Sequence, residues 1–296
     1  MGKLVKIIWI ILAFTNLLNA KVTPSEVFIE AKVIKLSLAD QVTKIKGVSL
    51  LPVIDIDLQG VTPSSVYALG SSLNMKLMIY ALANNKPWEN ISFPNTKIDP
   101  KQVQEMLLVI KKNIKNIFKV NSFVKITAQN KKPADVAIEL TYANQWLDKI
   151  MPNVKPKYPL SILERTENFI DKLLENKNIK FSDDINPKKY PEIKPKDVFI
   201  NVTATYNLLR NLKKISDNET SASHPYNILS ATNKVLPLDV FSLSVFNLYY
   251  LYSIGLNNFD STKKLHIKTK ISPSDVYKQA TRVNYKLALL LTVKGE

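Results

Sequence analysis

Eight segments of this 296-residue chain share one spacing of proline and apolar residues. In each segment, valine or isoleucine follows a proline at the third position, and leucine or isoleucine follows it at the fourteenth. Positions +7 and +10 complete the pattern, as in Val103, Leu107, Ile110 and Ile114 of the third segment. This 3-4-3-4 spacing is the inward stripe of an amphipathic helix, and a recurring unit sets the architecture of a chain. The pattern therefore predicts an all-α protein with an eightfold helical repeat. The eight prolines are Pro24, Pro63, Pro100, Pro133, Pro159, Pro195, Pro237 and Pro273.

The residues around each proline predict that a helix begins there. Proline suits the first helical turn, where its missing N–H would have no partner within the helix. Thr23–Glu26 and Asp99–Gln102 form capping boxes. Thr62 and Ser272 are further capping residues, whereas the other four starts depend on the proline and the residue two places after it. The expected helices span residues 23–42, 62–84, 99–118, 133–150, 158–176, 194–214, 236–256 and 272–292.

The connections between these helices are unusually long. Most contain 14–22 residues, whereas helical bundles usually use two to eight. Such connections can be partly extended and retrace a whole helix, so consecutive helices need not be antiparallel. The connection at 151–157 is short and proline-rich, which favours two four-helix modules at 21–151 and 152–296. One continuous helical array is the alternative.

Residues 1–20 resemble an export signal. Lys3 and Lys6 precede an apolar stretch at 7–18, and Ala20 ends a small-residue cleavage site. The apolar stretch is too short to cross a membrane, which takes about 20 residues. The chain is therefore expected to be periplasmic or secreted, with no membrane span after the signal is removed. A retained N-terminal anchor is the competing interpretation.

The chain carries a net charge of +16, from 38 lysines with only three arginines. A basic balance can indicate an anionic partner, such as an envelope polymer, lipid headgroups or nucleic acid. Specific nucleic-acid recognition is not expected, because it uses arginine for bidentate contacts. A solvated lysine-rich surface is the simpler interpretation. The chain contains no cysteine, which excludes disulfides and thiol chemistry.

Residues for catalysis or cofactor binding do not gather in the sequence. His224 and His266 lack neighbours at metal-ligand spacing, and the six glycines form no phosphate-binding loop. The carboxylate pairs Asp55/Asp57 and Asp183/Asp184 lie in polar connections, where turn formation is the simpler role. The sequence thus predicts a protein that is not an enzyme and uses no metal or cofactor.

The repeat favours a binding scaffold or adaptor with an unknown partner, since repeat arrays often serve as recognition surfaces. The candidate partner-binding residues are aromatic side chains in the long connections: Trp88, Phe93, Tyr190 and Tyr226. Each of them can alternatively pack back onto the helices. One rival function is a small-molecule carrier with a cavity near Tyr249. The other is a lytic enzyme, for which Glu164 or Glu167 would need a raised pKa.

Overall fold

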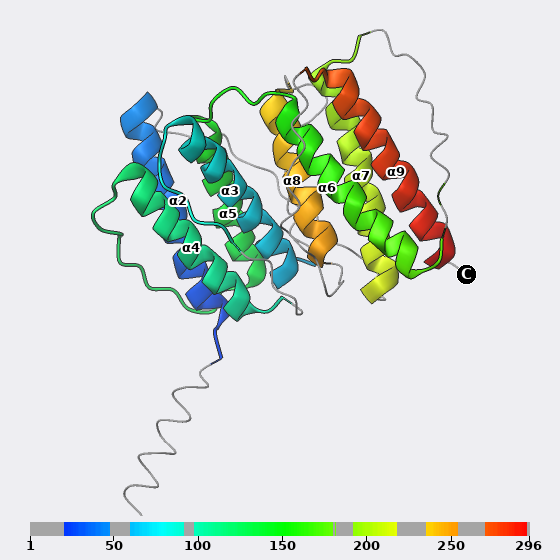
Figure 1. The fold of residues 1–296 in the computed structure, drawn as a ribbon. Coiled ribbons are helices and arrows are strands. Elements are labelled where there is room, and N and C mark those ends of the chain that lie inside the picture. The colour runs from blue at the N-terminus through cyan, green and yellow to red at the C-terminus, as the bar shows by residue number, and fades with distance from the viewer. Residues whose placement is uncertain are drawn as a thin grey trace, which may run out of the picture.

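A computed structural model describes residues 21–47, 60–91, 98–179, 181, 192–217, 235–253 and 270–294. These residues contain eight α-helices and no strand, which confirms the predicted all-α repeat fold (Figure 1). The helices are α2 (Pro24–Lys46), α3 (Pro63–Ala83), α4 (Pro100–Phe118), α5 (Pro133–Asp148), α6 (Lys157–Asn176), α7 (Pro195–Asp217), α8 (Pro237–Ser253) and α9 (Pro273–Lys294).

The repeat positions mark the helix starts and the buried stripe. Seven of the eight helices begin at their repeat proline, and α6 begins two residues before Pro159. The residues at positions +3 and +14 are buried in all eight helices. Positions +7 and +10 are buried as well, even where they are polar, as at Thr166, Thr205 and Asn247. The stripe that the sequence predicts therefore faces the interior of the protein.

Acidic side chains complete three of the four helix starts that lack a capping residue, all except the start of α6. The backbone N–H groups of Lys132, Lys194 and Leu236 each donate to the aspartate three residues later, at 2.7–2.8 Å. This is one half of a capping box. Both halves are present at Thr23–Glu26 and Asp99–Gln102, as predicted. The acidic residue also lies near the positive end of the helix dipole, where a negative charge is favourable.

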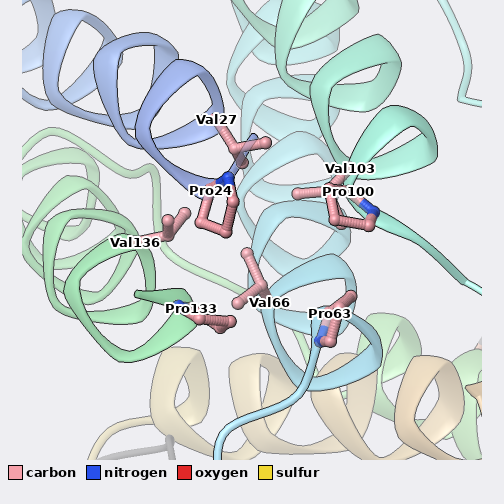
Figure 2. A pocket seen from close by; sticks show the side chains of 8 residues that line it. All are labelled: Pro24, Val27, Pro63, Val66, Pro100, Val103, Pro133 and Val136. Carbon is pink, nitrogen blue, oxygen red and sulfur yellow. The ribbon is translucent and has the colours of Figure 1, made fainter. Parts of the chain in front are cut away.

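The helices form two groups of four with the same arrangement. In the first group, α2 and α3 each contact both α4 and α5, which gives the cyclic order α2, α4, α3, α5. The second group repeats this order as α6, α8, α7, α9. We call these groups ring 1 and ring 2. In ring 1 the four repeat prolines and their +3 valines meet at one end (Figure 2). In ring 2 the four repeat prolines meet in the same way, together with Pro156 and the +3 valines of α7, α8 and α9. The four helices of each ring therefore run parallel.

A common register joins neighbouring helices within the rings. Position +6 of one helix faces position +11 of the next, where positions are counted from the repeat proline. Glu30 thus pairs with Lys111, and Glu139 pairs with Lys35 at 2.6 Å. The same register joins Leu69 O to Asn144 in ring 1, and Asn201 to Asn284 in ring 2. These polar pairs fix the longitudinal offset of parallel helices, which an apolar stripe alone would leave adjustable.

The two rings lie side by side and meet through α3 and α8. Burial raises the pKa of Tyr67, near the start of α3, and the nearby Tyr249, near the end of α8, adds to that rise. Burial raises the pKa of Asp239, at the start of α8, and the positive charge of Lys76, near the end of α3, opposes that rise. These two helices are therefore antiparallel, and the dipoles of one ring oppose those of the other (Figure 1). This arrangement offsets the repulsion between four aligned helix dipoles in each ring.

One hydrophobic core extends through both rings, because buried residues of α2–α5 and of α6–α9 belong to the same cluster. The predicted modules at 21–151 and 152–296 contain α2–α5 and α6–α9, respectively. Independent folding of each group stays a prediction. Residues 1–20, on which the export hypothesis rests, lie outside the described residues.

Candidate functional site

Of the four predicted partner-binding residues, the structure describes Trp88. Phe93, Tyr190 and Tyr226 lie outside the described residues. Trp88 follows the end of α3 and is half-buried against the hydrophobic core. Its indole Nε1 is buried and has no hydrogen-bond partner among the described residues. The ring thus packs partly onto the helices, which was the alternative interpretation, and keeps part of its surface exposed.

The connection that carries Trp88 is fixed to the helices by one buried asparagine. The Asn113 side chain of α4 accepts a hydrogen bond from the Glu89 N–H and donates one to the Glu89 carbonyl, both at 2.9 Å. The same side chain donates to Asn74 Oδ1 of α3, also at 2.9 Å. Glu89 further pairs with Lys112 at the surface. Trp88 is therefore held beside an anchored backbone, and nothing in the local sequence around Asn113 indicates this role.

A small apolar cavity closes the proline end of each ring. Figure 2 shows the cavity of ring 1, where the prolines and valines of four helix starts point toward one another. Its volume is about 20 Å³, and the corresponding cavity of ring 2 has about 30 Å³. A single water needs roughly 10–15 Å³ and polar partners, which these walls do not offer. Neither cavity can hold an organic ligand.

The aromatic residues of α8 belong to the core. The side chains of Phe246 and Tyr250 stack on each other. The centroid of each aromatic side chain lies 5.7 Å from that of Tyr206 in α7. Tyr252 meets Phe169 of α6 edge to face. Burial raises the pKa of Tyr249 to about 12. The interpretation of this cluster as core, rather than as the wall of a ligand cavity, fits these contacts.

The largest charged cluster in the described residues joins α6 and α9. Glu167 accepts hydrogen bonds from Gln279, from Arg282 at 3.0 Å and from Lys286 at 2.7 Å. Burial opposes ionisation of Glu167, but these donors outweigh it and lower its pKa. A general acid at neutral pH needs the opposite shift. Glu167 is thus an ionised carboxylate that pairs with the buried Lys286, which also pairs with Asp171.

A second charged pair lies where the two rings meet. The Lys76 side chain is 1% exposed and pairs with Asp148, at the end of α5, at 2.7 Å. Asp239 of α8 is near both groups. Burial raises the pKa of Asp239, and the negative charge of Asp148 contributes to that rise. Because Asp239 also accepts the Leu236 N–H, its arrangement is that of a helix cap.

No cluster of metal-ligand side chains occurs among the described residues. No described helix is long and apolar enough to cross a membrane. Comparison with models of protein families, with curated proteins and with solved structures gives no match. The class of protein is therefore defined by its own architecture, which is an all-α protein with two rings of parallel helices.

Proposed function

We propose that the protein is an exported, non-catalytic binding scaffold, and that the connection after α3 carries its partner-binding surface. The observation that supports this proposal is the anchoring of the Glu89 backbone, next to Trp88, by Asn113. A surface connection that is ordered before binding loses less conformational entropy when a partner arrives. Function also concentrates on connections that a rigid frame positions.

Trp88 is the central contact in this proposal. A tryptophan with an exposed part beside an ordered backbone has the character of an interface hot spot. Glu89 and Lys112 flank it with a partly exposed ion pair, which suits the polar rim of an interface. The proposed partner is a protein of the cell envelope or of the extracellular space.

The test is capture of envelope proteins by the purified chain with a chemical cross-linker. Trp88→Ala removes the proposed contact, whereas Asn113→Leu leaves Trp88 in place but releases its backbone anchor. Both variants should lose the cross-linked partner. Tyr285→Ala, which removes an aromatic residue that is 56% exposed on α9, should retain it. Circular dichroism establishes that each variant is folded. Capture that is unchanged by Trp88→Ala would overturn the proposal, as would substrate turnover that one carboxylate substitution abolishes.

Export is tested by sequencing the N-terminus of the mature protein. Cleavage of the proposed signal predicts Lys21, or a residue within a few positions of it, as the first residue. The first described helix begins at Pro24, just after this position, so cleavage would leave its cap at Thr23 intact. Recovery of Met1 on exported protein would instead support a retained anchor.

A further inference from the structure

We propose that the outer face of α4, together with the connection at 119–132, docks on anionic phospholipid membranes. The helix presents a continuous outer stripe at positions +1, +5, +8, +12, +15 and +19 from Pro100. All residues of this stripe are exposed, and they lie on the opposite side from Leu107 and Ile114. The stripe consists of Lys101, Glu105, Leu108, Lys112, Lys115 and Lys119.

The connection at 119–132 extends this face toward α2. The Lys111 ammonium pairs with Glu30 of α2 and lies 5.6 Å from the ring of Phe123 in the connection. Farther along, the Lys131 N–H donates to Ser25 Oγ of α2 at 3.0 Å. These contacts hold the connection against both α2 and α4 (Figure 1). Val124 and Lys125 of the connection are both exposed.

The charged residues of this face are almost all positive. Residues 106–134 include seven lysines and neither aspartate nor glutamate. Carboxylates from outside this stretch pair with two of the lysines: Glu30 with Lys111, and Glu89 with Lys112. Glu105 is the one carboxylate within the outer stripe. Five of the lysines in and beside the stripe are exposed and have no ion pair among the described residues: Lys101, Lys115, Lys119, Lys125 and Lys132.

The chemistry of the face fits a lipid surface better than a soluble polyanion. Clusters of four to eight basic residues are typical of binding to anionic lipids. The cations here are all lysines, which act as point charges and do not form the bidentate forks that read phosphates or bases. Leu108 and Val124 are 44% and 53% exposed among these lysines. Apolar side chains at this position can enter the boundary between headgroups and acyl chains, whereas a hydrated polymer offers them nothing.

The test measures co-sedimentation of the full chain with phosphatidylcholine vesicles, with and without phosphatidylglycerol. Vesicles of phosphatidylcholine alone report any contribution of the apolar residues 7–18. Binding should require phosphatidylglycerol and weaken as salt rises. Because each lysine contributes separately at an anionic surface, Lys115→Glu/Lys119→Glu should lower the partition coefficient at least about tenfold. The matched control is Lys177→Glu/Lys196→Glu, which makes the same charge change at two exposed positions of ring 2 and should bind like the wild type.

A second pair of measurements separates lipid from polymer. Leu108→Ser/Val124→Ser keeps the charge, so it should weaken vesicle binding about threefold or more, because it removes apolar contact with the membrane. Its retention by dextran sulfate should equal that of the wild type. The proposal fails if the wild type does not bind phosphatidylglycerol vesicles, or if the control double variant loses as much binding as the α4 variant. It also fails if the serine variant binds vesicles normally, since the face would then recognise charge alone. Trp88→Ala should bind vesicles normally, so the outcome is independent of the proposed protein-binding function.

Discussion

Helices α4 and α8 occupy the same place in their respective rings, yet their outer faces are opposite in character. At positions +1, +5, +8, +12 and +15, α4 has three lysines, Glu105 and Leu108. At the same positions α8 has Leu238, Ser242, Val245, Tyr249 and Tyr252. The inner stripes of both helices follow the same repeat and are buried. The inner stripe therefore packs the four helices of a ring together. The outer stripe determines whether a helix packs against the other ring, as α8 does, or faces outward, as α4 does.

The same contrast separates α3 from α7. Helix α3 packs against α8 of the other ring, and Ala68, Ser71 and Met75 on its outer side are buried. In α7 the corresponding positions are Ile200, Thr203 and Asn207, and none of the three is buried. A helix that is apolar on all sides must be covered on all sides. The helices α3 and α8 therefore meet each other, while α4 and α7 face outward.

The largest effect is expected from placing a lysine on the covered face of α8. Val245 is fully buried at position +8, so Val245→Lys would bury a charge with no partner. It should reduce the free energy of unfolding by at least about 4 kcal/mol. Leu108→Lys makes the matched change at position +8 of α4 and should stay within about 0.5 kcal/mol. Urea denaturation followed by circular dichroism measures both. Equal losses in the two variants would contradict the assignment of covered and exposed faces.

An intermediate effect is expected where the rings meet. Asp148→Ala removes the one ion-pair partner that the described residues give to the buried Lys76. A buried charge without its partner is costly, and because Asp148 is partly exposed we expect a loss of about 2–4 kcal/mol. Asp40→Ala breaks the exposed Lys44–Asp40 pair of α2 and should cost less than about 1 kcal/mol. The unfolding free energies of both variants decide the comparison. Similar losses would mean that water reaches Lys76 in place of Asp148.

A smaller, pH-dependent effect on the free energy of unfolding is expected in ring 2. Ring 1 has separate ion pairs between its helices, whereas ring 2 has one network around Glu167. Hydrogen bonds from Lys286, Gln279 and Arg282 lower the pKa of Glu167 below its usual 4.5 despite burial. The ionised carboxylate therefore stabilises the fold above the pKa that Glu167 has in the unfolded chain. This contribution disappears as pH falls through the lower pKa of the folded state. Glu167→Gln should cost about 1–3 kcal/mol at pH 7 and progressively less in acid. Unfolding measured across pH 3–7 gives the slope. A loss that does not change with pH would show that charge is not the reason for the effect.

Much of the fold could be predicted, because its signals are local. Proline fixes its own backbone angle, and the residue two places later reaches back to the helix start, so Pro195 with Asp197 marks the beginning of α7 without reference to any other part of the chain. The candidate site could be predicted only in part from the sequence. Trp88 could be selected as an aromatic residue in a connection, but Asn113, which anchors the neighbouring Glu89, lies 24 residues beyond Glu89 in the chain. Nothing in the local sequence links the two.

Two tertiary features, the contact between α3 and α8 and the ion pairs between helices of ring 1, have signals in the sequence that the repeat pattern alone does not include. The stretch 63–83 has one charged residue, Lys76, and 237–253 has one, Asp239. Such a lack of charge indicates a helix covered on every side, and the two residues belong to the polar group where the rings meet. Likewise, the +6 and +11 positions of α2, α4 and α5 include residues of opposite charge that prove to be paired.

The sequence by itself determined the number of helices in the described residues, their starts and the stripe that each one buries. These features depend on interactions within one helical turn or on the period of one helix. Only the tertiary structure decided that four helices run parallel, in which cyclic order they pack, and that α3 meets α8 between the rings. An apolar stripe drives burial without choosing a neighbour, because the hydrophobic effect is not directional. The choice comes from polar pairs such as Glu139–Lys35 and from the absence of charge on two outer faces, and both depend on residues far apart in the chain.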